Sequence, residues 1–258
     1  MNPGQPRYQP KYAVVTGAAR RLGRAIALGL ARDGWSIVLG YLSSQAEAEQ
    51  TAAEVRALGV QCVICQADMS QPDDVDKLMR CAIESGPVRC LVNNASLFEF
   101  DCAKSIEPVS FNQHMATNLL APLLLTRKLY EHIPEGEQGV VVNLLDQKLD
   151  NLNPDFLSYT LAKAGLNTAT RMLATELAPR LRVVGVSPGL TLISHLQTQA
   201  EFEQAHQISP INRSSQPEDI VNAVCFLVQS PAITGTTLLV DGGQHLVPMA
   251  RDFSMMNS

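Results

Sequence analysis

The sequence predicts one α/β domain in which a doubly wound parallel β-sheet is flanked by helices. Seven short runs rich in β-branched residues alternate with six longer amphipathic stretches, which is the pattern of βαβ units. The runs are almost continuously apolar, as expected for strands that are buried on both faces of a parallel sheet. A chain of 258 residues is long enough to bury the core of one such domain without disulfide bonds.

The predicted elements follow one another along the whole chain. The strands are expected at residues 12–16, 36–40, 61–66, 88–93, 139–144, 182–186 and 237–240. The helices are expected near residues 22–33, 45–58, 72–85, 107–132, 155–178 and 217–229. Right-handed crossovers would place ligands at the carboxyl ends of the strands, as in Rossmann-type folds. The longest gap, residues 189–216, is the expected substrate loop.

The composition excludes several other classes of protein. The chain is 46% hydrophobic and 17% charged, which is too apolar for a disordered chain. Its net charge of −5 and its lack of a basic stripe argue against a nucleic-acid partner. Six cysteines are too few for a disulfide scaffold and fit a reducing cytoplasm. The histidines show no metal-ligand spacing, so no metal is expected.

The Rossmann-type domain is expected to span residues 12–248, with a tail at each end. Residues 1–11 lack the apolar segment of a secretory signal and are expected to form a flexible N-terminal tail. Residues 249–258 are expected to form a C-terminal tail. Residues 220–240 carry no charge, which could indicate a membrane span, but polar residues and a proline interrupt them. A helix, a turn and a strand explain this stretch better, so no membrane partner is expected.

The first predicted strand leads directly into a loop with the sequence TGAARRLG, which begins at Thr16. Gly17 permits a tight turn, and Gly23 permits close packing where the next helix starts. The free N–H groups at this helix start suit a phosphate, and the strand–loop–helix context favours a dinucleotide site over a generic turn. Arg20, Arg21 and Leu22 form this helix start and are therefore predicted to bind the cofactor.

No acidic residue follows the second predicted strand, where a carboxylate would bind the ribose 2′-hydroxyl of NAD and repel a 2′-phosphate. The local charge comes instead from Arg20, Arg21 and Arg24, which favours NADP. Ser43 and Ser44 are candidate donors to the 2′-phosphate. The same serines could also cap the next helix, and the two roles are compatible.

Polar residues also follow the third and fourth predicted strands. Asp68 could accept a hydrogen bond from the adenine amino group, or it could be an ordinary aspartate at a helix start. Asn94, Ala95 and Ser96 are small or polar residues at a strand end, where a cofactor can approach the backbone.

Tyr159 and Lys163 are four residues apart, so a helix would present both on one face. An ammonium group beside a phenol is expected to lower the pKa of the phenol and to make it a proton donor or acceptor near neutral pH. Asp146 lies just past the fifth predicted strand, where the strand end and the following helix could bring the carboxylate to the same substrate atom. It could otherwise be a simple turn residue.

Taken together, TGAARRLG, NNAS, Asn118, YTLAK and PGLT resemble the short-chain dehydrogenase/reductase family over about residues 12–246. Most members of that family have a glycine where Arg21 stands and a serine where Asp146 stands. Both departures are similar to the pteridine reductases, a subgroup of the family. Phe98, which follows NNAS by two residues, is a further match to that subgroup.

The resemblance implies hydride transfer from NADPH to a C=N bond of a dihydropterin, with dihydrofolate as a further candidate substrate. Asp146 and Tyr159 would deliver the proton, and Lys163 would hold the nicotinamide ribose. Asn118 would support a water beside the lysine, and Phe98 would stack on the pterin. Arg21 and Ser96 would contact the cofactor and the substrate, while PGLT adds three cofactor contacts, from Pro188, Gly189 and Thr191.

Two other functions remain open at this point. The first is a carbonyl reductase of the same family, such as a 3-oxoacyl thioester reductase. The second is a dinucleotide-binding regulator without catalysis. The histidine and arginine that well-known pteridine reductases carry after the second strand are replaced by Leu42 and Ser43. The resemblance also implies that the helices near 107–132 and 155–178 pair between subunits of a homotetramer, whereas a monomer with well-packed helices is the alternative.

Overall fold

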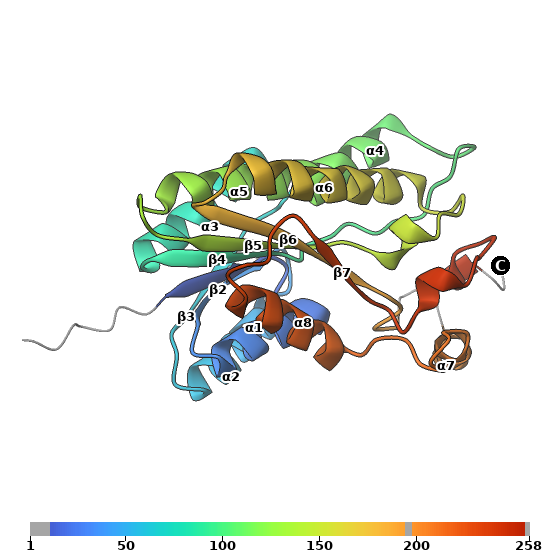
Figure 1. The fold of residues 1–258 in the computed structure, drawn as a ribbon, viewed down its shortest axis with the longest axis horizontal. Helices are drawn as coiled ribbons and strands as arrows, with labels where there is room; N and C mark the ends of the chain where they lie inside the picture. The colour runs from blue at the N-terminus through green and yellow to red at the C-terminus, as the bar shows by residue number, and fades with distance from the viewer. Residues whose placement is uncertain (1–10, 194–197, 256–258) are drawn as a thin grey trace, which may run out of the picture.

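Seven parallel strands form one sheet in the computed structural model, which describes residues 11–193 and 198–255. The strand order is β3-β2-β1-β4-β5-β6-β7, which confirms the predicted doubly wound sheet (Figure 1). The strands are β1 Tyr12–Val15, β2 Ser36–Tyr41, β3 Cys62–Gln66, β4 Val88–Asn93, β5 Gly139–Leu144, β6 Leu181–Pro188 and β7 Thr237–Val240. The chain runs outward from β1 to β3 and then returns to β4 on the other side of β1. The ends of β1 and β4 therefore form the switch point where such sheets bind ligands.

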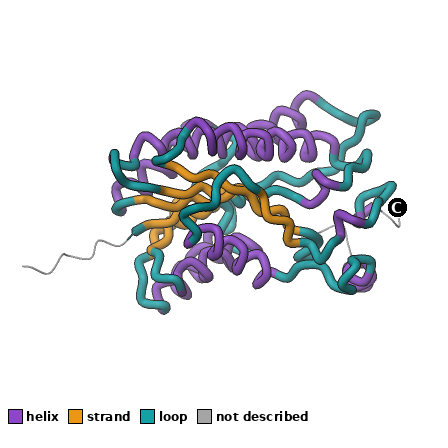
Figure 2. The backbone as a smooth tube through the Cα atoms, in the orientation of Figure 1, coloured by secondary structure: helices purple, strands orange, loops and turns teal. Residues whose placement is uncertain are grey.

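Helices cover both faces of the sheet, so the molecule has three layers (Figure 2). One face carries α1 Arg21–Arg32, α2 Gln45–Ala57 and α8 Pro217–Gln229 (Figure 1). The other face carries α3 Pro72–Ser85, α4 Pro108–Met115, α5 Ala121–His132 and α6 Leu157–Glu176. A shorter helix, α7 Gln199–Gln207, lies within the predicted substrate loop.

The core alternates along each strand because successive side chains of a strand point to opposite faces. In β1, Ala13 and Val15 pack in the cluster beneath α1 and α8. Tyr12 and Val14 pack in the cluster on the α3 and α5 side. All four side chains are buried, so both faces of β1 exclude water. This double burial holds the strand ends, and the loops that follow them, in fixed positions.

The helix that was predicted over residues 107–132 is interrupted. A π-helical turn, η1 Ala116–Leu120, separates α4 from α5, and the N–H of Ala121 bonds to the carbonyl of Ala116. Pro122 explains the interruption, because it has no N–H to donate to the carbonyl of Asn118 four residues earlier. The π turn therefore lies at one of the predicted site residues.

The uncharged stretch 220–240 is divided between α8, a turn and β7, as the sequence analysis expected. No helix within the described part of the chain is long and apolar enough to cross a membrane. Residues 1–10 of the expected N-terminal tail and residues 194–197 of the expected substrate loop lie outside the described residues. Residues 249–255 are described and pack against the rest of the domain.

The contact between α1 and α8 provides a test of the packing. A Cβ atom added to Gly29 would lie 2.3 Å from Cγ1 of Val221. We expect Gly29→Ala to lower the free energy of unfolding by about 1–3 kcal/mol, because two packed helices must separate. In a Val221→Ala background the same change should cost much less, because the clashing methyl is absent. Urea unfolding of the four proteins measures both effects, and an equal cost in the two backgrounds would contradict this packing.

Candidate active site

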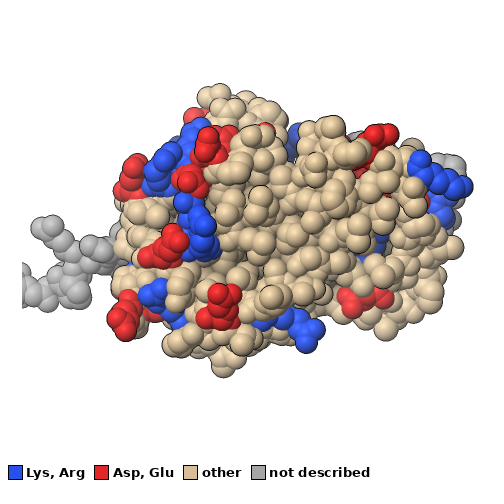
Figure 3. Space-filling model, turned by 90° about the horizontal axis from the view of Figure 1, so that it is seen from above, with Lys and Arg blue, Asp and Glu red and all other residues tan. Residues whose placement is uncertain are grey.

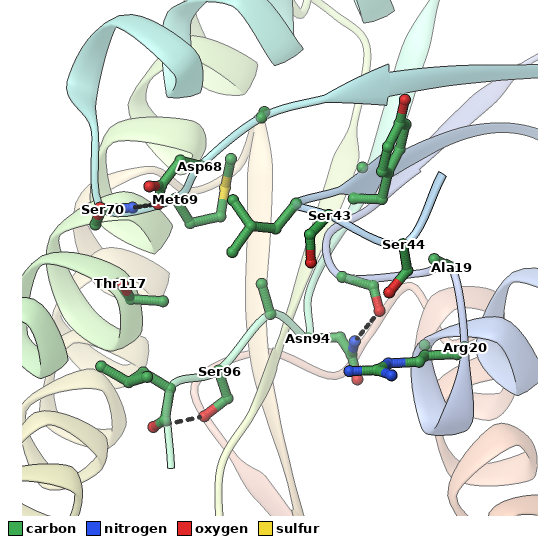
Figure 4. Close-up of a pocket in the computed structure, with 18 of the residues that line it drawn as sticks. Ala19, Arg20, Ser43, Ser44, Asp68, Met69, Ser70, Asn94, Ser96 and Thr117 are labelled. Atoms are coloured by element: carbon green, nitrogen blue, oxygen red, sulfur yellow. Dashed lines mark hydrogen bonds between the residues drawn. The ribbon is translucent and has the colours of Figure 1, made fainter. Parts of the chain in front are cut away.

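Two adjoining cavities lie at the carboxyl ends of the strands. The larger has a volume of about 590 Å³ and extends from the first loop past the ends of β2 and β3. In Figure 4, Arg20, Ser43 and Ser44 lie on one side of this cavity, and Asp68, Met69 and Ser70 lie on the other. Eleven predicted cofactor residues line it: Gly17, Arg20, Arg21, Leu22, Gly23, Ser43, Ser44, Asp68, Asn94, Ala95 and Ser96.

The first loop is shaped for the close approach of a ligand backbone. Gly17 has φ +63°, and a Cβ atom there would lie 3.0 Å from the Cα of Ala95. A Cβ atom on Gly23 would lie 2.3 Å from the carbonyl oxygen of Gly17, so the loop closes only with glycine at this position. Asn94 fastens the loop to β4 by donating from Nδ2 to the carbonyl of Thr16 at 2.8 Å.

The start of α1 is open to an anion. Arg21, Leu22 and Gly23 of its first turn line the larger cavity, and the turn contains no acidic residue. No carboxylate of this turn would therefore repel an anion that binds to the free N–H groups of the helix start. Arg21 has φ +54°, a left-handed conformation that favours glycine. An arginine at this position therefore carries backbone strain.

The three arginines near this loop have different surroundings. Arg24 forms an ion pair with Glu54, and Arg21 donates to the carbonyl of Ile193 at 2.7 Å. Arg20 points into the larger cavity near Ser44 (Figure 4). Ser44 occupies the N-cap position of α2, but its side chain makes no capping hydrogen bond within the described residues. Its hydroxyl is therefore available to the cavity.

The second cavity, of about 300 Å³, adjoins the first and lies at the ends of β5 and β6. Its lining includes Asp146, Tyr159 and Lys163, together with Phe98. The predicted cofactor residues Pro188, Gly189 and Thr191 line it from the other side. Within residues 11–193 and 198–255, no three His, Cys, Asp or Glu side chains gather as a metal site.

Asp146 and Tyr159 are directly hydrogen-bonded. The Tyr159 hydroxyl donates to Oδ2 of Asp146 at 2.7 Å, and the N–H of Lys148 donates to Oδ1 at 2.8 Å. Lys163 lies one turn along α6 from Tyr159 and donates from Nζ to the carbonyl of Leu144 at 2.7 Å. The end of β5 and the first turns of α6 thus bring the three predicted residues into one cavity.

The electrostatics of this group correct one expectation. Burial raises the pKa of Tyr159 well above its ordinary value, and the Asp146 carboxylate raises it further. The predicted lowering of the Tyr159 pKa by Lys163 is therefore wrong for the protein without ligands. Burial also raises the pKa of Asp146 and lowers the pKa of Lys163 to about 8. The phenol keeps its proton and donates it, while the carboxyl is shifted toward the protonated form.

Phe98 forms one wall of the second cavity. Its ring stacks on Phe156 with a centroid distance of 4.1 Å and meets the ring of Tyr159 edge-on at 4.8 Å. Phe156 is fully buried and has φ +57°, a strained conformation for a bulky residue. One face of Phe98 is thus covered by Phe156, which leaves the ring fixed as a flat apolar surface.

Asn118 is the predicted site residue that lines neither cavity. Its side chain accepts from the N–H of Leu97 at 2.8 Å and donates to the carbonyl of Leu97 at 2.8 Å. This pair of bonds fixes the loop between Ser96 and Phe98. Asn118 therefore supports the cavity wall formed by Ser96 and Phe98 without lining the cavity itself.

The structure also adds site residues that the sequence analysis did not name. Gln244 lines the second cavity and accepts from the N–H of Leu190 at 2.9 Å, which fixes the loop after β6. Asp252, Phe253 and Ser254 line the same cavity, although the sequence analysis assigned this segment to a tail. Asp252 bonds to Lys148 and Asp155, which lie about a hundred positions earlier in the chain, so no local pattern could have revealed this placement.

Comparisons with known proteins agree with this architecture. A family model for enoyl-(acyl carrier protein) reductases, which are short-chain dehydrogenases/reductases, matches residues 17–245. The crystal structure of FolM alternative dihydrofolate reductase 1 from Brucella canis, complexed with NADP, superposes with a TM-score of 0.88. It is 37% identical and covers 93% of this chain and 96% of its own.

Two curated relatives extend the comparison. An uncharacterized oxidoreductase of Methylorubrum extorquens is 35% identical over 246 residues, which cover 92% of this chain and 98% of the relative. The 3-oxoacyl-[acyl-carrier-protein] reductase FabG of Staphylococcus epidermidis is 31% identical over 243 residues, which cover 92% and 99%. From the fold, the paired cavities and these likenesses, we conclude that the chain belongs to the short-chain dehydrogenase/reductase family and is an oxidoreductase.

Proposed function

We propose that the protein reduces a C=N bond of a dihydropterin, or of dihydrofolate, with NADPH. The observation that carries the proposal is the hydrogen bond between the Tyr159 hydroxyl and the Asp146 carboxylate at 2.7 Å. Reduction of an imine requires a proton on nitrogen, and a buried carboxylic acid can carry that proton. The likeness to the FolM alternative dihydrofolate reductase supports the same substrate class.

The two adjoining cavities together would hold NADP. The glycine loop and the start of α1 would hold the pyrophosphate, and Arg20 with Ser43 and Ser44 would hold the 2′-phosphate. Asp68 would accept from the adenine, and Lys163 would bind the nicotinamide ribose. The NADP that is bound in the FolM structure supports this choice of cofactor. When bound, NADPH supplies the hydride.

The residues of the second cavity would perform the remaining steps. Phe98 offers a fixed apolar face against which a flat heterocycle can stack, with Arg21 and Ser96 at its edge. Asp146 would give a proton to the ring nitrogen, directly or through Tyr159, while the ring carbon of the C=N bond would accept the hydride that NADPH supplies. Solvent then returns a proton to Asp146. The balance is one hydride and one proton for each C=N bond that becomes C–N.

The rival substrate is a 3-oxoacyl thioester, which the likeness to FabG favours. A carbonyl oxygen that becomes an alkoxide needs hydroxyl donors, and it has no need of a carboxylic acid beside the tyrosine. Asp146 and the stacked Phe98 therefore favour the pterin. A regulator without catalysis would not require a buried phenol that is hydrogen-bonded to a carboxyl group.

The substrate class is tested by following NADPH oxidation with dihydrobiopterin or dihydromonapterin, and then with acetoacetyl thioester. We expect turnover of the pterin. Asp146→Ser should lower kcat for the pterin by roughly 10²-fold or more, since the proton donor is removed, and should change ketone turnover by less than about tenfold. Asp146→Asn controls for the change of side-chain shape. It keeps the shape of the aspartate but cannot donate a carboxyl proton, so it should lose pterin turnover as Asp146→Ser does. Turnover of the thioester alone would refute the proposal.

The catalytic role of Tyr159 is tested by Tyr159→Phe. This variant should bind NADPH with a Kd within about threefold of the wild type, because the ring remains in place. It should lose turnover by about 10²-fold or more, because the hydroxyl that bonds Asp146 is absent. Tyr130→Phe on α5 is the control for loss of a tyrosine hydroxyl away from the cavities. Turnover that survives in Tyr159→Phe would show that the hydroxyl is not needed.

We also propose that the protein is a homotetramer in which α4–α6 faces pair between copies. Val109 on α4 and Met172 on α6 are 72% and 66% exposed, and Leu161, about three turns before Met172 on α6, is 48% exposed. The surface over α5 and α6 carries little charge at its centre (Figure 3). An exposed apolar face of this kind favours association with another copy.

Met172→Glu tests this interface. We expect it to lower the molar mass measured by size-exclusion chromatography with light scattering, because a charge would be buried between copies. The far-ultraviolet circular dichroism should stay unchanged. Leu58→Glu at the end of α2 is the control, since Leu58 is also exposed (43%) but lies on the opposite layer. A monomeric wild-type protein would contradict the proposal.

A further inference from the structure

The C-terminal segment 249–255 is a wall of the second cavity, although it follows the last strand by several residues. Asp252, Phe253 and Ser254 line that cavity together with Asp146 and Tyr159. The segment includes a short 3₁₀ turn, η4 Phe253–Met255. A second carboxyl group, that of Asp252, therefore faces the site that holds the Asp146 carboxyl.

Two ion pairs fix this segment to the loop between β5 and α6. The Nζ atom of Lys148 lies 2.9 Å from Oδ2 of Asp252, and the Lys148 side chain is only 3% exposed. Nε of Arg251 lies 2.8 Å from Oδ2 of Asp155, whose side chain is 4% exposed. The N–H of Asp252 donates to the same Asp155 oxygen at 2.8 Å. These buried contacts hold Asp252 in one place and orientation.

Lys148 links the two carboxyl groups. Its backbone N–H donates to Oδ1 of Asp146 at 2.8 Å, and its ammonium group pairs with Asp252. Asp252 also accepts from the N–H and the hydroxyl of Ser254, at 3.1 and 2.7 Å. An ammonium group and two further donors are partners that suit an ionised carboxylate.

The two acids therefore differ in their surroundings. Asp146 receives hydrogen bonds from the Lys148 N–H and the Tyr159 hydroxyl, and no ammonium group bonds to it among the described residues. Two carboxylates in one cavity repel each other, so the Asp252 carboxylate favours the neutral form of Asp146. Among the described residues, the other charged or titratable side chains that line this cavity are Tyr159 and Lys163 on α6 and Arg21 at the start of α1.

We propose that Asp252 is a positioning residue whose charge keeps the Asp146 carboxyl in its proton-carrying form during turnover. The inference rests on the proposed function, in which Asp146 supplies the proton. Consistent with it, the charge of Asp252 adds to the effect of burial in raising the pKa of Asp146. The C-terminal segment thus sets the pH range of the reaction without contacting the reacting nitrogen.

Removing Asp252 and removing Lys148 should shift the basic limb of the pH profile in opposite directions. Loss of structural support would give the same direction for both variants, so the comparison distinguishes an effect of charge from an effect of structure. Asp252→Asn removes a negative charge, so Asp146 ionises at lower pH. On the basic limb of the pH profile, kcat should then fall by roughly threefold to tenfold at fixed pH. Lys148→Met removes the compensating positive charge and should raise kcat on that limb by a similar factor. The double variant should return toward the wild-type profile.

Arg251→Met is the matched control, because it breaks the other ion pair of the same segment without removing a charge that faces Asp146. It should leave the position of the basic limb unchanged. If Asp252→Asn and Lys148→Met move the limb in the same direction, or if neither moves it, the proposal is refuted.

A second readout needs no substrate. Infrared spectra of the NADP-loaded enzyme over a pH series report the carbonyl band of a protonated carboxyl group, assigned by its loss in Asp146→Asn. The band should disappear at lower pH in Asp252→Asn and at higher pH in Lys148→Met. If the band shifts in this way and no pterin is turned over, the proposed substrate is wrong and the role of Asp252 stands. If the band does not shift, the role of Asp252 is wrong whatever the substrate.

Discussion

The hydrogen bond between Tyr159 and Asp146 is the contact on which the proposed chemistry depends. It joins the end of β5 to the first turn of α6 at a distance of 2.7 Å. The two residues are separated by a loop that contains the turn η2 Gln147–Asp150 and the strained residue Phe156. This loop must fold back on itself for the carboxyl group to reach the phenol. Ion pairs of Lys148 with Asp252 and of Asp155 with Arg251 hold that loop against the C-terminal segment.

Backbone strain is concentrated around the same cavities. Arg21 and Phe156 both have left-handed backbone conformations, which cost on the order of 1–3 kcal/mol for residues with side chains. Each places a side chain that glycine could not supply. Arg21 brings a guanidinium group to the boundary between the cavities, and Phe156 supports the ring of Phe98. The surrounding core, buried on both faces of the sheet, provides the stability that offsets these costs.

Burial and charge act together on the ionisable groups. A low-dielectric environment favours the neutral forms, so the phenol retains its proton and the pKa of Lys163 falls to about 8. The nearby carboxylates of Asp146 and Asp252 strengthen the shift for Tyr159. The hydrogen bond between Tyr159 and Asp146 places a phenol and a carboxyl group side by side in the cavity. In the proposed function this pair donates the proton that the ring nitrogen requires.

Local sequence patterns predict the sheet and the glycine loop, and every predicted site residue except Asn118 lines one of the two cavities. These features are local: apolar runs of strand length, glycines after a strand, and the four-residue spacing of Tyr159 and Lys163. Three other features appear only in the folded chain: the π turn at Asn118, the ion pair of Arg24 with Glu54, and the C-terminal wall of the second cavity at Asp252. The direction of the Tyr159 pKa shift also belongs to this group, because it depends on burial and on a carboxylate from another element. Contacts between residues far apart in the chain produce no local pattern in the sequence. Their free energy comes from side chains that become neighbours only when the chain has folded.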